Sequence, residues 1–229
     1  TYLSATPISV WEEMKKAMNE LLLAGSVLLI YGIVLLAYRF FGKTGLYAMT
    51  ALATVFANIE VLIVIDAFGV QQTLGNVMFA STYLITDILS ENESKESANR
   101  SVALGIMTSA MMFIFTQYWQ LYTPAESDWA MPHIRAIFST TPRLLLGSFL
   151  GYAVSQRFDV WLYHRIWKAT TEKSDDSKRF LWLRNNGSTM LSQIINTILF
   201  TLIAFAGVYD NSTLISIMIS SYVVYIFTS

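Results

Sequence analysis

Long apolar stretches separated by short polar segments make up most of the chain. A helix that crosses a bilayer needs about 20 mostly apolar residues, and seven stretches approach or reach that length. They lie at about 21–41, 45–65, 76–90, 101–122, 142–167, 188–207 and 212–229. The pattern predicts an all-α fold: a polytopic membrane helix bundle of about seven helices, forming a single transmembrane domain over residues 21–229.

Residues 1–20 are more polar and allow two interpretations. Val10, Met14 and Met18 share one helical face, which is typical of a short amphipathic helix that lies in the membrane interface. The alternative is a soluble extension of the first span. We describe 1–20 as an interfacial N-terminal segment and leave the alternative open.

The composition agrees with a membrane protein. Hydrophobic residues make up 54% of the chain and charged residues 14%, against about 25% charged residues in a typical soluble domain. That is too little charge to cover a surface exposed to water. The formal net charge is −1, so no basic field attracts nucleic acid, and the lipid bilayer is the expected surrounding.

Lysine and arginine gather in alternate loops, as they do in the cytoplasmic loops of membrane proteins. The rich segments are 39–44, 91–100 and 165–187, and the poor ones are 66–75, 123–141 and 208–212. With seven spans, this alternation predicts that the N-terminus lies outside the cell and the C-terminus inside.

Three of the predicted spans carry a narrow stripe of polar and aromatic side chains on an otherwise apolar helix. Residues three or four positions apart share a helical face. The stripes consist of Phe79, Tyr83, Asp87 and Glu91; Tyr152, Gln156, Asp159 and Tyr163; and Thr189, Gln193, Asn196 and Phe200. Because polar groups that face lipid stay unpaired, we expect the stripes to meet inside the bundle and line a cavity.

Carboxylates, carboxamides and aromatic rings together suit a flat heterocycle with several hydrogen-bonding groups. Rings stack on its face, carboxylates accept from its ring N–H and amino groups, and carboxamides pair with its amide edge. The alternative for any single residue is a plain hydrogen bond between helices, which the same side chains also form.

Asn58, Glu60 and Arg143 are polar groups whose surroundings the sequence leaves open. Asn58 and Glu60 are two positions apart and therefore face different ways, so we expect only one of them to face the cavity. Arg143 begins its span near the outer boundary, where it extends toward water or pairs with Glu60 or Asp66.

No catalytic or metal-binding motif is present. His133 and His164 are far apart, and the chain contains no HExxH, GxSxG, Walker A or GxGxxG motif and no cysteine. Asp87 and Asp159 imitate the acid pair of an intramembrane protease, but neither has the flanking glycine motif. We therefore expect a protein that is not an enzyme and has no cofactor and no metal site.

Three motifs follow one another between residues 45 and 229. Asn58 precedes a helix that contains Tyr83, Asp87 and Glu91 in the pattern Tyr-x-x-x-Asp-x-x-x-Glu. Residues 156–160 read Q-x-x-D-V, and residues 182–197 read W-x-R-N…S-T…S-Q-x-x-N-T. In this order they resemble the queuosine precursor transporter family, also called the VUT family.

The resemblance implies uptake of a 7-deazaguanine such as preQ0, preQ1 or queuine, for tRNA modification, across the bacterial inner membrane. It also implies a six-helix core similar to the substrate-binding subunits of energy-coupling-factor transporters, to which the span 21–41 is an addition. The substrate-binding residues implied are Asn58, Phe79, Tyr83, Asp87, Gln156, Asp159, Trp182, Arg184, Asn185, Gln193 and Asn196. Among them Phe79, Tyr83 and Trp182 are expected to stack on the ligand, while Arg184 and Asn185 gate from the cytoplasmic side.

One departure and one alternative bear on this interpretation. Asn196 stands where the family pattern usually has Asp, and a neutral amide compensates a ligand ammonium less well than a carboxylate does. A preference for neutral preQ0 is expected, unless Asp87 or Asp159 holds the amine. The alternative function is a binding subunit that delivers its ligand through an ATPase; the sequence is compatible with that energy-coupling partner and with a homo-oligomer.

Overall fold

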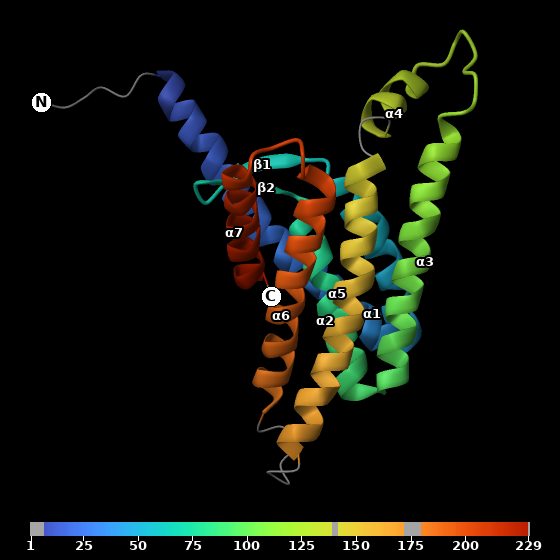
Figure 1. The fold of residues 1–229 in the computed structure, drawn as a ribbon, viewed down its shortest axis with the longest axis vertical. Coiled ribbons are helices and arrows are strands. Elements are labelled where there is room, and N and C mark those ends of the chain that lie inside the picture. Colours follow the sequence, from blue (N-terminus) through green and yellow to red (C-terminus); the bar gives the residue numbers. More distant parts are fainter. Residues whose placement is uncertain (1–6, 139–141, 172–179, 229) are drawn as a thin grey trace, which may run out of the picture.

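The computed structural model describes residues 7–138, 142–171 and 180–228, which form helices and one two-stranded hairpin (Figure 1). In chain order they are α1 (Pro7–Glu60), β1 (Val64–Ala67), β2 (Val70–Thr73), α2 (Gly75–Asn92), α3 (Lys95–Trp119), α4 (Ala130–Phe138), α5 (Pro142–Thr171), α6 (Leu181–Phe205) and α7 (Asn211–Thr228). The predicted all-α helix bundle is confirmed.

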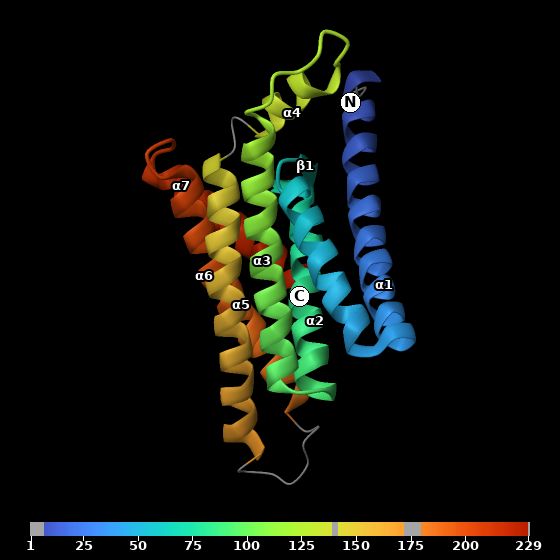
Figure 2. The same cartoon turned by 90° about the vertical axis from the view of Figure 1, so that its right-hand side faces the viewer.

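α1 is two helices joined by a sharp reversal. Gly42 has φ 57° and ψ −147°, a left-handed conformation that glycine adopts without steric cost. The first limb, residues 7–41, runs away from the N-terminal end, and the second limb, residues 43–60, runs back toward it (Figure 2). The two limbs together with α2, α3, α5, α6 and α7 correspond to the seven predicted spans, while the short α4 lies in the connection between α3 and α5.

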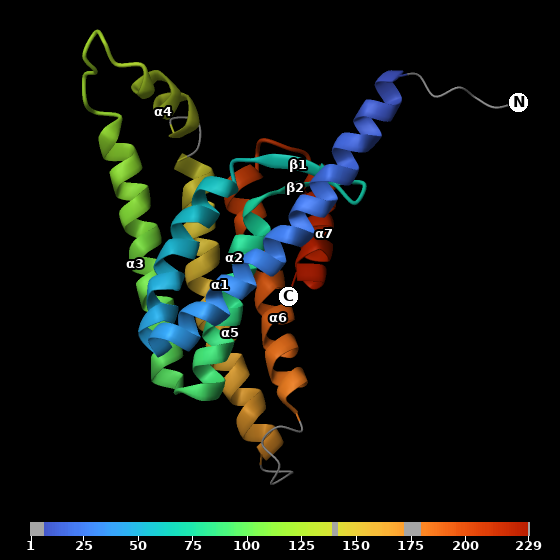
Figure 3. The same cartoon turned by 180° about the vertical axis from the view of Figure 1, so that it is seen from behind.

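By length and composition, three of the described helices are apolar enough to cross a membrane. They are Glu13–Glu60 within α1, Lys95–Trp119 and Leu181–Phe205. α2, α5 and α7 run alongside them in the same bundle (Figures 1 and 3). α2 and α5 carry buried acids and amides that lower their mean hydropathy, because these helices contribute polar side chains to the interior.

The predicted span 45–65 is wrong at its end, because the helix stops at Glu60 and a hairpin follows. Val64 pairs with Thr73 and Ala67 with Val70 in antiparallel register. Phe68 and Gly69 make the turn, both with positive φ, which matches the twist of two-residue hairpins. The adjacent β-branched residues Val64 and Ile65 favour the strand.

Residues 7–20 are continuous with the first limb of α1, so the described part of the N-terminal segment is an extension of that helix. Residues 1–6 lie outside the described residues. The extension is attached to the hairpin: Asn19 Nδ2 donates to the Asp66 carbonyl over 3.0 Å, and the Phe68 N–H donates to Glu20 Oε1 over 2.9 Å. The first limb crosses the face of the bundle toward the reversal at Gly42 (Figure 3).

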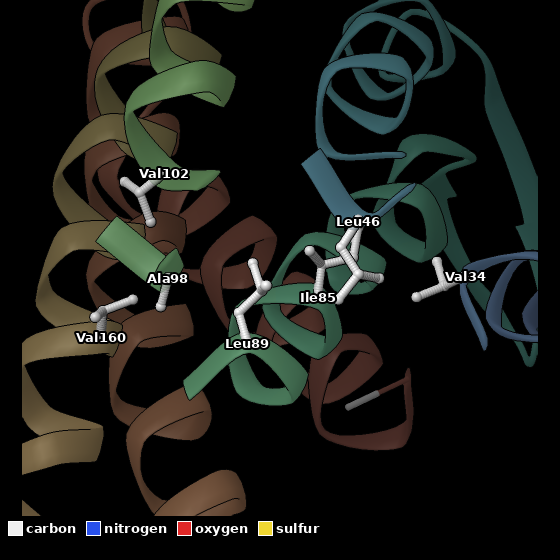
Figure 4. Close-up of a cluster of buried hydrophobic side chains, with 7 residues drawn as sticks. All are labelled: Val34, Leu46, Ile85, Leu89, Ala98, Val102 and Val160. Atoms are coloured by element: carbon white, nitrogen blue, oxygen red, sulfur yellow. The ribbon is translucent and has the colours of Figure 1, made fainter. Parts of the chain in front are cut away.

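Apolar side chains from five helical segments meet near the reversal (Figure 4). The cluster contains Val34, Leu46, Ile85, Leu89, Ala98, Val102 and Val160. Elsewhere the most extensive helix contact is between α5 and α6. Gly151 of α5 makes it possible, because a Cβ there would lie 2.7 Å from Asn196 Oδ1; small residues let membrane helices approach closely.

Asp210, in the connection between α6 and α7, caps the N-terminus of α7. Asp210 Oδ2 accepts hydrogen bonds from the backbone N–H groups of Ser212 and Thr213, at 3.0 and 3.2 Å. These contacts satisfy donors that the first turn of a helix leaves free. Hydrogen bonds from Ser212 and Thr213 hold the pKa of Asp210 below its usual value.

The connections predicted to be cytoplasmic lie at one end of the bundle. The reversal in α1, the α2–α3 turn and the facing ends of α5 and α6 are together there, and the hairpin and α4 lie at the opposite end (Figures 1 and 2). Lys43 Nζ lies 3.9 Å from Glu93 Oε2, linking two of these connections. We name the two ends the inner and outer ends after the predicted orientation, which stays a prediction.

Cysteine labelling tests this orientation cleanly, because the chain contains no native cysteine. Lys95 and Glu126 are both exposed, at the inner and outer ends. An impermeant maleimide added to intact cells is expected to label Glu126→Cys and to label Lys95→Cys only after the cells are broken. Labelling of Lys95→Cys alone in intact cells would reverse the assignment.

Candidate ligand-binding site

A cavity opens at the outer end of the bundle, below the hairpin. It encloses about 660 Å³, including space that is open to the outside. Its walls come from α1, β2, α2, α3, α5, α6 and α7, so segments from most of the chain enclose it. We call it the outer cavity. Among its lining residues are Asn58, Asn76, Phe79, Tyr152, Asn196, Thr197, Thr201 and Tyr225.

Aromatic rings surround Phe79 at the base of the outer cavity. The Phe79 ring lies 5.6 Å from that of Tyr83, 5.7 Å from that of Tyr152 and 6.3 Å from that of Tyr225, measured between centroids. The first two pairs are edge-to-face, an arrangement that the charge distribution of aromatic rings favours. This cluster offers both ring faces and ring edges to a flat molecule.

A second cavity lies toward the inner end, between the first limb of α1, α2 and α6. It encloses about 460 Å³, again including open space. We call it the inner cavity. Tyr31, Tyr83, Asp87, Asn185 and Thr189 contribute to its wall. Phe79 and Tyr83, one helical turn apart on α2, therefore belong to different cavities.

Three buried polar residues lie between the two cavities along α5 and α6. Gln156, Asp159 and Gln193 are each at most 1% exposed. On α6, Gln193 follows Thr189 of the inner cavity by one turn and precedes Asn196 of the outer cavity by about one turn. We call these three residues the central polar residues.

The central polar residues are only partly satisfied by the protein. Gln156 Nε2 donates to Thr82 Oγ1 over 2.7 Å, and Ser192 Oγ donates to Asp159 Oδ1 over 3.2 Å. Gln156 Oε1, Asp159 Oδ2 and both amide atoms of Gln193 have no hydrogen-bond partner among the described residues. Each unpaired buried group costs about 1–3 kcal/mol, so this cluster is expected to be satisfied by something that enters it.

Asn58 of α1 and Asn196 of α6 both line the outer cavity. Asn58 Nδ2 donates to the Thr54 carbonyl over 2.8 Å and to Ser109 Oγ over 3.0 Å, so its side chain also joins α1 to α3. Asn196 packs on Gly151 and lies within hydrogen-bonding reach of Tyr225. The sequence left open whether Asn58 or Glu60 faces the cavity. In the structure Asn58 lines the outer cavity and Glu60 does not.

Arg184 is completely buried and is held by Glu91. Its Nη2 lies 2.7 Å from both carboxylate oxygens of Glu91, and its Nε lies 3.1 Å from Oε2. Tyr163 donates to Glu91 Oε2 over 2.7 Å, and the guanidinium carbon lies 4.4 Å from the centroid of the Trp167 ring. These contacts join α2, α5 and α6 near the inner end, and the Glu91 carboxylate neutralises the positive charge of Arg184.

Trp182 is placed differently from what the resemblance implied. Arg143 is exposed, which agrees with one of its two alternatives, while the other, an ion pair, is not formed. Trp182 is 70% exposed and lines neither cavity. Arg143 does not pair with Glu60 or Asp66; it donates to the carbonyls of Ile203 and Ala206, near the end of α6. Carbonyls at a helix C-terminus lack intrahelical partners and carry partial negative charge, which explains why a cation is stable there.

Sequence reasoning missed Tyr225 on α7 and Tyr31 on α1. Both lie in stretches without an acid or a carboxamide. The hydroxyl side chains there, such as Ser216 and Ser220, do not predict a facing, because they also bond to the carbonyls of their own helix. Only the packing of α7 against α2 and α6, and of the first limb of α1 beside α2, brings them to the cavities.

Comparison with known proteins now gives the family. The model of a family described as "Putative vitamin uptake transporter" matches residues 73–229. The chain belongs to this vitamin uptake transporter family. A "Probable queuosine precursor transporter" from Bacillus subtilis (strain 168) is 40% identical over 192 residues, which are 84% of this chain and 82% of the relative. No solved structure matches the chain.

Membership of this transporter family agrees with the apolar helices and with the two cavities. The chain is a multi-pass membrane protein of a transporter family, with many polar side chains buried between helices that expose large apolar side chains on their outer faces. The resemblance identified from the motifs is confirmed by both comparisons.

The buried ion pair between Glu91 and Arg184 is expected to be sensitive to loss of one partner. Glu91→Gln should lower the free energy of unfolding by about 3–5 kcal/mol, because it leaves a buried cation uncompensated. The double substitution Glu91→Leu with Arg184→Met should cost less than Glu91→Gln alone. Thermal and denaturant unfolding in detergent measures both.

The matched control is the exposed pair of Lys43 and Glu93. Glu93→Gln should change the free energy of unfolding by at most about 1 kcal/mol, since exposed ion pairs contribute little. If Glu91→Gln costs no more than Glu93→Gln, the structural role assigned to the buried pair is incorrect.

Proposed function

We propose that this chain takes up a queuosine precursor, a 7-deazaguanine base, across the bacterial inner membrane for use in tRNA modification. The observation that carries the proposal is the set of unpaired, fully buried polar atoms on Gln156, Asp159 and Gln193. The name of the Bacillus subtilis relative supports the ligand class.

The unpaired atoms complement the hydrogen-bonding groups of such a base. Three oxygens, on Gln156, Asp159 and Gln193, accept hydrogen bonds, and the Gln193 amide nitrogen donates. A 7-deazaguanine offers N–H donors at two ring nitrogens and at its exocyclic amino group, and acceptors at its carbonyl oxygen and remaining ring nitrogen. A ligand richer in donors than in acceptors matches a site richer in acceptors.

The aromatic cluster around Phe79 supports the same ligand class. Burial of a flat ring against Phe79, Tyr83 or Tyr152 adds stacking to the hydrogen bonds. Tyr83 is held in place because its hydroxyl donates to Ser155 Oγ over 2.9 Å. The ligand is thus expected to bind between rings of α2 and amides of α5 and α6.

The two cavities suggest how the base moves. They lie on opposite sides of the central polar residues, and Phe79 and Tyr83 separate them. In this proposal a base enters from the outer cavity, is held at the central residues, and leaves through the inner cavity when the rings rearrange. Uptake into proteoliposomes that contain this chain alone separates this function from that of a binding subunit, which would need its ATPase partner.

Ligand-dependent stabilisation of the purified protein tests the ligand class. At a ligand concentration 100 times its Kd, stabilisation of about 2.7 kcal/mol is expected. We expect preQ0, preQ1 or queuine to raise the unfolding temperature and riboflavin to leave it unchanged. Stabilisation by riboflavin, with none by the three precursors, would assign the chain another vitamin.

Gln193 provides a second test, because its buried amide is expected to bind the ligand and also to destabilise the protein when no ligand is present. Gln193→Leu removes a buried amide with no partner, so the free energy of unfolding without ligand should rise by about 1–3 kcal/mol. The stabilisation by ligand should disappear in the same variant. Unfolding curves with and without ligand measure both effects.

Gln72 supplies the control for Gln193. Its amide is also buried and has no partner among the described residues, but it lies in β2 of the hairpin and not on α5 or α6 between the two cavities. Gln72→Leu should raise stability as Gln193→Leu does and should retain the full response to ligand. Retention of ligand binding in Gln193→Leu would exclude Gln193 from the site.

A further inference from the structure

Asp87 is a carboxylate that lines a cavity and has no partner among the described residues. It is only 9% exposed, in the wall of the inner cavity. No hydrogen bond or ion pair reaches its oxygens from the residues that the structure describes. A buried carboxylate is stable only when a cation or several donors compensate it, and the inner cavity is the space from which such a group reaches Asp87.

The side chains that line the inner cavity beside Asp87 leave its charge uncompensated. Tyr31, Tyr83, Asn185, Asn186 and Thr189, which surround it from three helices, are all uncharged side chains.

The nearest charged groups add negative charge or are already neutralised. Asp159 on α5 is close enough to repel the Asp87 carboxylate, whereas the charge of Glu91 on α2 is balanced by its ion pair with Arg184. The basic side chain beside them, Arg184, is already compensated by Glu91 in a two-point ion pair. The net result is a site that favours positive charge.

The outer cavity has the opposite character. None of its described lining residues carries a charge; its polar groups are amides and hydroxyls. A ligand with a neutral ring and a charged substituent therefore meets two distinct surroundings: uncharged polar and aromatic groups outward of the central residues, and the Asp87 carboxylate inward of them.

We propose that Asp87 and the inner cavity form a subsite for a positively charged amine on the ligand, so that the chain selects cationic 7-deazaguanines. The inference rests on the proposed function and refines it. preQ1, whose aminomethyl group carries an ammonium, is then preferred over preQ0, whose nitrile is neutral. The amide at Asn196 does not prevent this preference, because the acid that meets the amine is on α2.

Affinities for three ligands test the proposal in the wild-type protein. The ligands are preQ1, preQ0 and 7-ethyl-7-deazaguanine, in which a methyl group replaces the ammonium at nearly the same size. Wild type is expected to bind preQ1 at least about 10-fold more tightly than either neutral ligand, the effect of one charge-assisted hydrogen bond. Equal affinities, or a preference for preQ0, would overturn the proposal.

Asp87→Asn and Glu60→Gln separate this subsite from a general effect of charge. Asp87→Asn should weaken preQ1 by about 10–100-fold and the neutral ligands by less than about 3-fold. Glu60→Gln removes a half-buried carboxylate at the outer end, outside both cavities, and should leave the preference unchanged. An equal loss for all three ligands in Asp87→Asn would make Asp87 a structural residue and refute the subsite.

The outcomes also distinguish failure of the subsite from failure of the proposed function. If all three bases bind without preference, the function stands and the amine subsite is wrong. If none of them binds while wild type is folded, as judged by its unfolding transition, the proposed function is wrong as well.

Discussion

A bilayer supplies no hydrogen-bond partners, so every polar side chain within these helices has to be satisfied inside the bundle. Most of them are: Asn58 binds α3, Tyr83 binds α5, and Arg184 on α6 binds Glu91 on α2. In each case a polar contact fixes the relative position of two helices. Because lipid tails are as apolar as leucine, such contacts and close packing determine which helix faces meet.

The same constraint makes the exceptions informative. Gln156, Asp159 and Gln193 are as deeply buried as the residues that hold the helices together, yet part of each side chain has no partner among the described residues. Packing alone would favour apolar residues at these positions. The structure thus separates two kinds of buried polar residue: Arg184 joins helices through its ion pair with Glu91, and the central polar residues are the ones that the proposed function assigns to ligand binding.

Much of this organisation was predictable from the sequence. Helical spacing placed Asp87, Gln156 and Gln193 on inward-facing stripes, since inward and lipid-facing positions differ in polarity along every span. The hairpin was missed because its strand continues an apolar run, V-L-I-V-I, that reads equally well as the last turn of a helix. Partners distant in the sequence were also missed: nothing local shows that Arg184 meets Glu91 or that Tyr225 reaches the outer cavity.

The first limb of α1 contacts both ends of the proposed route. Through Asn19 and Glu20 it holds the hairpin, whose Thr73 borders the outer cavity, and through Tyr31 it forms part of the wall of the inner cavity. It continues into the second limb through the reversal at Gly42, and Val34 packs in one cluster with Leu46 of the second limb. A rigid tilt of this limb about Gly42 would therefore move the hairpin beside the outer cavity and Tyr31 in the wall of the inner cavity at the same time. Access to the two cavities from the two sides of the membrane would then be coupled.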